Sequence, residues 1–426
     1  MLALHNNHNF IMREPLPKRT VKLTELVRQV QTPNRNGLFR LKLTPQIEGT
    51  VEDREQWQES LGKASLITSV DVRVMHLQEN NNEEAVSPTA MYEILQDVGR
   101  LPKIDTLKIS GYCDAMPISI FTNLLKLCPH LTTVHFISVK FCTNNTADLE
   151  ELSHAVASHP SLRDWRFQDC QYVLPRDDNS SVFMDSILAG VAGSSTLESL
   201  CLTPTRPHAM GTMSLESIPA LANLKTLRLG QIGNFLETGK QALSPLQTLL
   251  AMLASNQTQL SLLHIPFYPN ETNCRALQTT LTHNTTLRGL SLRTYADCRS
   301  PEPLTLIAQA LAKNNSTLEE FEFLGSMRIR NPGILQEFAQ ILEVNYTLQE
   351  LVLFELVTSR NHSPEMNYHA KLNQHGRKQW LQEMYQNNLE KDTVDARMEF
   401  LEQLAKDQDD VFYYLSRMNP SFLQSI

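Results

Sequence analysis

Histidine and cysteine are among the side chains that bind metals or act as nucleophiles, and this chain carries 13 histidines and 7 cysteines. The cysteines are scattered and include no Cys-x-x-Cys pair, which a zinc site or a redox motif would use. His154 and His159 are five residues apart, one more than the spacing that places two ligands on one helix face. We therefore expect no metal site and a reducing compartment, with cysteines such as Cys128 and Cys298 packed as small apolar residues.

Motifs for phosphate binding and for hydrolytic catalysis are incomplete or absent in the sequence. The segment Leu61 to Ser65 contains a Gly-Lys pair, but it lacks the upstream glycine of a phosphate-binding loop and the hydroxyl directly after the lysine. The chain has no His-Glu-x-x-His, no Gly-x-Ser-x-Gly and no Gly-x-Gly-x-x-Gly. The sequence therefore predicts a protein that is not an enzyme, uses no cofactor and binds no small-molecule substrate.

Composition restricts the partners and the compartment. The net charge of −8 at pH 7 argues against a dedicated nucleic-acid binder. No apolar run approaches the roughly 18 residues that a membrane-spanning helix needs, and the first ten residues lack the apolar core of a signal peptide. We expect an intracellular protein, cytoplasmic or nuclear, that binds neither nucleic acid nor membranes. A length of 426 residues fits two to three domains or one continuous repeat array.

The elements that would position functional side chains come from a repeat. A six-residue phrase, apolar-x-x-apolar-x-apolar, recurs at intervals of 27 to 37 residues. The eleven phrases begin at Leu38, Ile67, Ile104, Leu131, Leu162, Leu197, Leu224, Leu260, Leu287, Leu318 and Leu348. A single phrase is weak evidence in a leucine-rich chain, but eleven in phase predict eleven short strands.

The segments between the phrases have helical periodicity. From Pro301 to Lys313 the apolar residues Leu304, Ile307, Ala308 and Leu311 follow the i, i+3, i+4, i+7 pattern of one helix face. The same pattern predicts helices over Ala147 to Ser158, Ser244 to Ser255, Glu271 to Thr282 and Pro332 to Glu343. Each unit is thus a strand and a helix that can bury its apolar face only by stacking on its neighbours.

This unit resembles the leucine-rich-repeat solenoid of the ribonuclease-inhibitor type, in which every unit carries a full helix. The resemblance covers roughly three quarters of the chain. It implies an α/β horseshoe with a parallel concave sheet of about eleven short strands and convex helices. That family places Asn or Cys three residues after the phrase, and Cys170 is the residue that matches.

The repeat divides the chain into three parts. Residues 1–37 form an N-terminal segment with a cap helix from Val21 to Gln31, residues 38–360 form the array, and residues 361–426 form a helical C-terminal cap. The stretches Lys371 to Arg377 and Met418 to Ser421 are similar to the tail behind such repeats in proteins of unicellular algae. A separate docking module is the alternative for this last part.

Strand alternation sends the remaining phrase residues to the concave surface. The central concave column is Lys42, Asp71, Lys108, His135, Arg166, Cys201, Arg228, His264, Ser291, Glu322 and Val352. We predict that a protein partner binds a basic strip and an acidic-apolar end. The strip is Lys108, His135, Arg166, Arg228 and His264, and the end is Glu320, Glu322, Glu350 and Phe354. The alternative is that these charges are merely solvated.

An open surface without a catalytic constellation predicts a non-catalytic protein-interaction scaffold whose partner is a protein of unknown identity. Two alternatives stay open. One is a regulator of an enzyme, like GTPase-activating or nuclease-inhibiting repeat proteins, and the other is the substrate receptor of a ligase.

Overall fold

The structure is a computed structural model, and its described part covers most of the repeat array. It comprises residues 21–31, 38–43, 47–48, 50–74, 89–111, 116–143, 145–173, 182–204, 206, 209–210, 212–232, 244–294, 302–313, 317–325, 337–338, 340–342, 344–353 and 373–374. Predictions for Phe354, Cys298 and residues 361–426 other than Asn373 and Gln374 lie outside the described residues.

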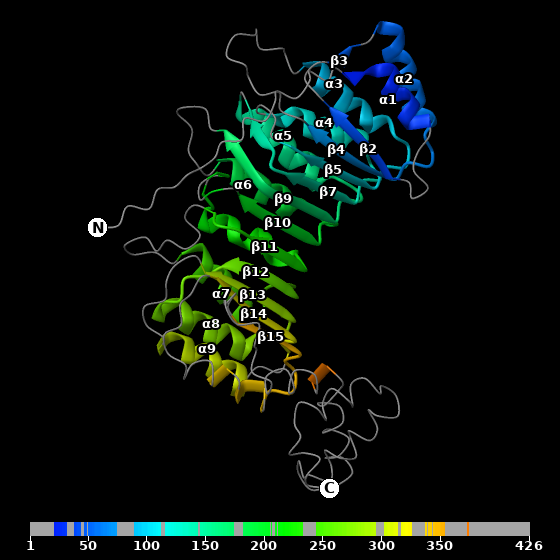
Figure 1. Cartoon of the computed structure of the whole chain (residues 1–426). Coiled ribbons are helices and arrows are strands. Elements are labelled where there is room, and N and C mark those ends of the chain that lie inside the picture. The colour runs from blue at the N-terminus through cyan, green and yellow to red at the C-terminus, as the bar shows by residue number, and fades with distance from the viewer. Residues whose placement is uncertain are drawn as a thin grey trace, which may run out of the picture.

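Within this part of the chain, a row of eleven strands forms one open sheet whose spatial order is the order of the sequence (Figure 1). The strands are β2 (Leu38–Leu43), β4 (Ser69–Val74), β5 (Thr106–Ser110), β7 (Thr133–Ile137), β9 (Asp164–Val173), β10 (Ser199–Pro204), β11 (Thr226–Leu229), β12 (Leu262–Pro266), β13 (Gly289–Thr294), β14 (Glu320–Gly325) and β15 (Glu350–Leu353). Every neighbouring pair in the row is parallel. The predicted α/β leucine-rich-repeat solenoid is confirmed by this topology.

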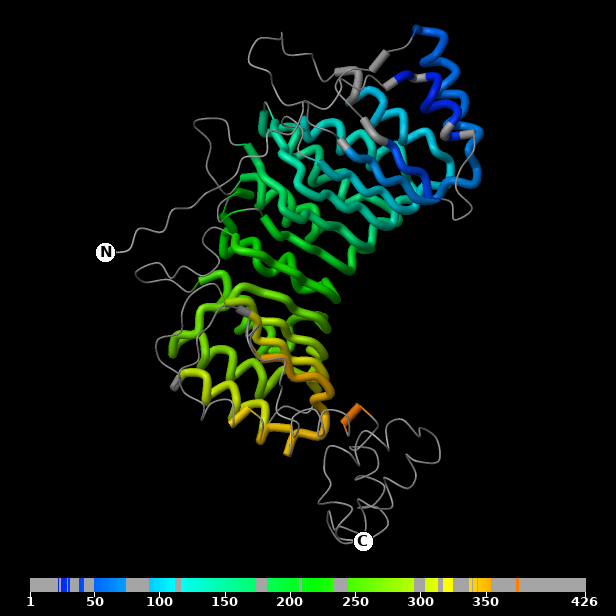
Figure 2. The backbone as a smooth tube through the Cα atoms, in the orientation of Figure 1, coloured from blue at the N-terminus to red at the C-terminus, as the bar shows by residue number. Residues whose placement is uncertain are grey.

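Helices connect the strands and lie along one side of the curved sheet, leaving its other face open (Figure 2). They are α1 (Leu23–Gln31), α2 (Val51–Lys63), α3 (Thr89–Asp97), α4 (Ile118–Leu127), α5 (Thr146–Ala157), α6 (Val182–Gly193), α7 (Pro245–Ala254), α8 (Glu271–His283) and α9 (Glu302–Lys313), with the 3₁₀ segments η1 (Val98–Arg100) and η2 (Leu215–Asn223). The four predicted helices now labelled α5, α7, α8 and α9 begin and end within one residue of the predicted bounds. No described helix is long and apolar enough to cross a membrane.

Local sequence explains where these helices begin. Ser244 and Gln247 form a capping box at the start of α7, and the Asn270 side chain accepts a hydrogen bond from the backbone N–H of Asn273 in α8. Helix α1, which the sequence predicts as a cap, begins at Leu23, two residues after the predicted start, because Val21 and Lys22 form strand β1, which pairs with β3 (Ile47–Glu48).

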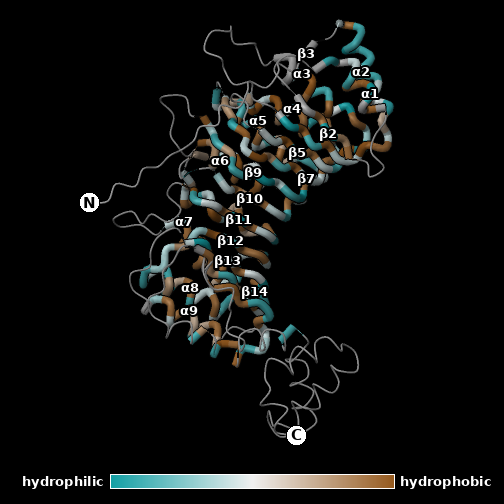
Figure 3. The backbone as a smooth tube through the Cα atoms, viewed as in Figure 1, coloured by the Kyte–Doolittle hydropathy of each residue, from teal (hydrophilic) through white to brown (hydrophobic). Residues whose placement is uncertain are grey.

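The core lies between the sheet and the helices. Leu200, Leu227, Leu263, Leu290 and Phe321 align in register on neighbouring strands, and all are buried. Figure 3 shows hydrophobic and hydrophilic residues alternating along the strands. In the N-terminal half this core is aromatic, and its central rings are those of Phe121, Phe136, Phe141, Trp165 and Phe167.

The register of the first strand differs from the prediction by two residues. Phe39 pairs with Val70 and Leu41 pairs with Val72, so Phe39 and Leu41 are the core residues of β2. Arg40 therefore stands opposite Asp71 in the central concave column, and the assignment of Lys42 was wrong. The phrase search took Leu38 as an anchor, whereas the larger Phe39 fills the core position.

Two short strands, β6 (Met116–Pro117) and β8 (Lys140–Cys142), make a second parallel ladder with the end of β9. The chain enters this ladder through residues with positive φ, Ser138 (φ 57°) and Asp169 (φ 53°), each two residues past its phrase. Cys170 follows directly, and its Sγ lies 3.6 Å from the carbonyl oxygen of Phe136 in the preceding unit. The residue that matches the family pattern thus contacts the backbone of the neighbouring repeat.

Polar residues also recur in the turns from helix to strand, three residues before the phrase. The amide nitrogen of Asn284 donates to the carbonyl of Leu253 (2.8 Å), and its amide oxygen accepts the N–H of Leu287 (2.7 Å). Asn345 makes the equivalent contacts with Leu311 (2.6 Å) and Leu348 (2.9 Å). These amides join consecutive units by hydrogen bonds to buried backbone groups.

His159 takes the same place in an earlier unit. Its Nε2 lies 3.1 Å from the carbonyl oxygen of Cys128, and its Nδ1 accepts the N–H of Leu162 (3.0 Å). Because Nδ1 is the acceptor, the proton resides on Nε2. We call His159, Asn284 and Asn345 the turn row.

Candidate protein-binding surface

The parallel register places the five predicted basic residues in one row across the open face of the sheet. Lys108 pairs with His135, His135 with Arg166, and Arg228 with His264, while Cys201 stands between Arg166 and Arg228. The row continues through Ser291 and Glu322 to Val352. We call this sequence of residues, from Lys108 to Val352, the concave row.

The arginines of this row differ in how their charge is compensated. Arg166 Nε lies 2.8 Å from Oδ2 of Asp164, and this hydrogen bond raises the pKa of Arg166. Asp164 is two residues earlier on the same strand, so its carboxylate offsets the guanidinium charge. Arg228 is exposed and forms no ion pair with any residue in the described ranges. Of the two arginines, Arg228 is therefore the stronger positive site.

The two histidines of the row are half-buried and resist protonation. Burial is the largest cause that lowers the pKa of His135, and the charges of Arg166 and Lys108 lower it further. For His264 burial comes first and the neighbouring Arg228 second, while Glu322 acts in the opposite direction. Since an ordinary histidine has a pKa near 6.5, both are neutral at pH 7 and act there as hydrogen-bonding groups.

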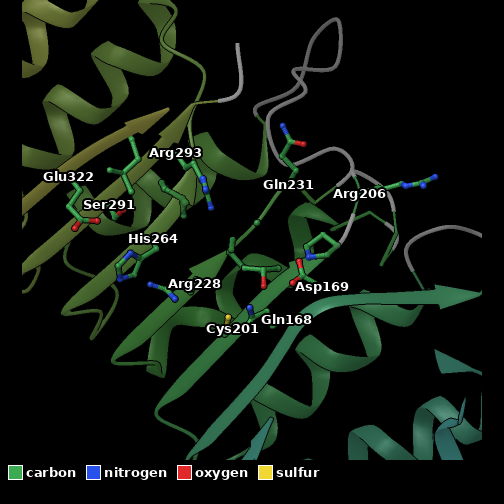
Figure 4. A pocket seen from close by; sticks show the side chains of 16 residues that line it. Gln168, Asp169, Cys201, Arg206, Arg228, Gln231, His264, Ser291, Arg293 and Glu322 are labelled. Carbon is green, nitrogen blue, oxygen red and sulfur yellow. The ribbon is translucent and has the colours of Figure 1, made fainter. Parts of the chain in front are cut away.

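A groove of about 580 Å³ lies over β9 to β14 and the loops that follow several of them (Figure 4). Its titratable or charged lining side chains, apart from Cys201, are Asp169, Arg206, Arg228, His264, Arg293 and Glu322. Gly230 contributes to one wall, where a Cβ atom would come within 2.9 Å of the Cα of Thr203. A larger residue at this position would therefore force the two neighbouring units apart.

Sequence analysis had missed Arg206 and Arg293 as groove residues. Arg293 follows Ser291 by two residues on β13, so strand alternation could have identified it. Arg206 comes after β10, where no periodicity fixes its direction. Ser291 differs from the expected exposed residue, because it is only 6% exposed between His264 and Glu322.

The acidic end of the surface lies on the last two strands. Glu320 pairs in register with Glu350, while Glu322 pairs with Val352. Burial is the first cause that raises the pKa of Glu320, followed by the negative charges of Glu350, Glu322 and Glu319. None of the three predicted carboxylates, Glu320, Glu322 and Glu350, forms an ion pair within the described part of the chain. Like charges on neighbouring strands repel, so this end favours a cationic partner group.

The described residues contain no group of three or more His, Cys, Asp or Glu side chains that could hold a metal ion. Cys128 is buried, and burial raises the pKa of its thiol to about 12. Burial likewise raises the pKa of Cys170 to about 12. Both thiols stay protonated near neutral pH and are packing residues.

Comparison with known proteins adds little to this geometry. No protein-family model matches the sequence. No curated protein matches it either. A crystal structure of a complex of TLR13 with the single-stranded RNA ssRNA13 is similar over 74% of this chain and 36% of that chain, with 13% sequence identity and a TM-score of 0.39. The chain thus spans about a third of the length of that structure.

Proposed function

We propose that this protein is a non-catalytic scaffold that binds a protein partner on the open face of its repeat sheet. The observation that carries the proposal is the ordered, uncompensated charge of the concave row, with Arg228 in the middle units and Glu322 near the C-terminal end. Charges of ordered sign on an exposed surface select partners and speed their association more than they add affinity.

The type of repeat, the class of partner and the location of the protein are also part of this proposal. Most described units carry an α-helix, which supports the ribonuclease-inhibitor type, although a 3₁₀ segment replaces it between β10 and β11. The negative net charge supports a protein partner rather than a nucleic acid. An enzyme regulator and a ligase substrate receptor would use this same surface, so the identity of the partner distinguishes them. We assign the protein to the cytoplasm or nucleus, without enzymatic activity or cofactor.

We also propose that the chain divides into an N-terminal segment (1–37), the repeat array (38–360) and a C-terminal cap (361–426). The proposed cap would be similar to the tails of algal repeat proteins. One contact supports the cap. The amide nitrogen of Asn373 donates to the carbonyl oxygens of Asn345 (2.8 Å) and Leu348 (2.7 Å), which belong to the turn before the last strand. Asn373 thereby covers backbone groups at the end of the array.

The test is affinity capture from the source cell followed by association kinetics with the captured partner. The test variant reverses three cations of the concave row: Lys108→Glu, Arg166→Glu and Arg228→Glu. The matched control reverses three cations on helices: Lys63→Glu, Lys126→Glu and Arg275→Glu.

We expect the concave variant to associate about tenfold more slowly at low salt, with a weaker salt dependence, because attraction between exposed charges is screened by salt. The helix control should associate at the rate of the native protein. Equal rates for all three proteins would overturn the proposal and direct attention to the loops or to residues 361–426.

A further inference from the structure

Arg228 and Glu322 are uncompensated charges of opposite sign within one groove, which continues past Arg228 to residues of β10 and β9. They stand on β11 and β14, and the register connects them through His264 and Ser291 on the two strands between. Adjacent strands lie about 4.8 Å apart, so three steps separate the two backbone positions by about 14 Å. Neither side chain has an ion pair with a described residue, and Figure 4 shows both lining the same groove.

The floor between these charges is uncharged near neutral pH. The lowered pKa of His264 leaves it neutral, and Ser291 is small and buried. Asp169 and Arg206 line the groove outside the concave row and carry opposite charges, so together they leave the net charge of the groove unchanged. Arg293 already interacts within the chain. Along the concave row, the groove therefore presents a positive residue on β11, a small polar floor on β12 and β13, and a negative residue on β14.

We propose that this groove binds an extended segment of a protein partner that carries an acidic and a basic side chain four residues apart. This inference rests on the proposed function and specifies its ligand. An extended chain advances about 3.4 Å per residue, so residues i and i+4 are about 14 Å apart, which matches the separation of Arg228 and Glu322. In such a chain, side chains at i, i+2 and i+4 point to the same face.

The match in spacing gives each side chain a counterpart. The acidic residue contacts Arg228, whose planar guanidinium suits a carboxylate or a phosphate. The basic residue four positions away contacts Glu322, with Glu320 and Glu350 adding negative charge beyond it. The side chain between them lies over His264 and Ser291, where space and hydrogen-bonding groups favour a small polar residue.

Labelled synthetic peptides test this with the full chain, using fluorescence anisotropy. The reference peptide carries glutamate and lysine four residues apart with serine midway. Comparison peptides carry two glutamates, two lysines, or glutamate and lysine only one residue apart. A further peptide replaces the glutamate by phosphoserine, which separates a carboxylate from a phosphate as the anionic group. We expect the reference or its phosphoserine form to bind about tenfold tighter than the other three.

Charge swaps in the protein make the result specific to these two residues. Arg228→Glu should make the two-lysine peptide the preferred ligand, and Glu322→Lys should make the two-glutamate peptide preferred. The exposed pair of Glu271 and Arg275 on α8 provides controls, Glu271→Lys and Arg275→Glu, which should leave the native preference unchanged.

Unaltered preference in the swapped proteins, equal binding of the closely spaced peptide, or no binding of any peptide would overturn the inference. The proposed function is judged separately by the association rate of the triple concave variant. If that rate falls while the peptides show no order of preference, the partner uses the concave surface without this spacing. If the rate is unchanged, the proposed function itself fails.

Discussion

Two sets of polar residues recur along this solenoid, and they differ in one physical respect. The turn row buries its polar atoms and satisfies them within the chain, as Asn284 and Asn345 do through backbone groups of two units. The concave row leaves Arg228 and Glu322 without ion pairs among the described residues. A repeating polar position in a sequence is therefore structural when its hydrogen bonds close within the chain, and available to partners when they do not.

This difference implies opposite responses to mutation. Removing a buried amide leaves its backbone partners unpaired, at about 1 to 3 kcal/mol for each group. Removing an exposed charge changes the free energy of unfolding by about 1 kcal/mol or less. The turn row should thus affect folding and the concave row should affect association.

The largest loss of stability should come from a substitution in the core behind the concave row. Leu290 is 2% exposed on β13, and Leu290→Asp would bury an unpaired carboxylate at a cost of several kcal/mol. Arg228→Asp, on an exposed position two strands away, should change stability by about 0.5 kcal/mol or less. Thermal unfolding of both variants is the measurement, and equal shifts would mean that the strand register is wrong.

The second effect concerns the turn row itself. Asn345→Ala removes the partners of the Leu311 carbonyl and of the N–H groups of Thr347 and Leu348. We expect the free energy of unfolding in urea to fall by about 3 kcal/mol or more, because three groups lose a partner at about 1 kcal/mol or more each. Asn373→Ala removes two donated hydrogen bonds and should cost less, about 1 to 2 kcal/mol.

Arg228→Ala is the matched control for both variants and should leave the unfolding midpoint nearly unchanged. If Asn345→Ala is as mild as this control, pairing within the chain does not separate the two rows. If Asn373→Ala alone is mild, the array ends without the help of residues 361–426.

Apolar periodicity was sufficient to predict the strands, their parallel order and the bounds of α5, α7, α8 and α9, because apolar spacing directly reflects which face of an element is buried. It failed at β2, where the leucine pattern hid the role of Phe39. It also did not indicate that the asparagines before the phrases contact the preceding unit. Their hydrogen bonds to the preceding unit depend on how units stack, which one unit's sequence does not contain.

The site was predicted less completely than the fold. Alternation identified the row that contains Arg228 and Glu322, since it depends only on the period of a strand. It could not show that Asp164 neutralises Arg166, because side-chain direction decides that contact. It also expected Ser291 to be exposed, whereas larger neighbours cover a small side chain on a concave surface.

The third prediction uses pH to probe one member of the turn row. Burial is the first cause that lowers the pKa of His159, so the folded protein binds its proton less readily than the unfolded chain. Stability is therefore fully present above the ordinary histidine pKa of about 6.5 and falls as the pH drops below it, by at most about 1.4 kcal/mol per pH unit for this one proton.

The substitution His159→Asn places at this turn the amide that Asn284 and Asn345 use elsewhere. Urea unfolding at a series of pH values should show a shallower loss of stability on acidification than in the native protein. Other groups still titrate in both proteins, so the difference between the two curves isolates His159. Parallel curves would contradict a buried neutral role for this ring.

The smallest effects should separate two arginines within the concave row. Arg166→Gln breaks an exposed ion pair with Asp164 and should lower the free energy of unfolding by up to about 1 kcal/mol, whereas Arg228→Gln breaks none and should leave it unchanged. Association should show the reverse order. Neutralising Arg228 removes an uncompensated charge of the groove and should slow binding of the captured partner about threefold. Neutralising Arg166 should slow binding less, because Arg166 does not line the groove and Asp164 already offsets its charge. Stopped-flow kinetics at low and high salt, beside urea unfolding of the same two proteins, measure both orders. If Arg166→Gln proves stronger in both measurements, compensation within the chain does not determine which charges a partner uses.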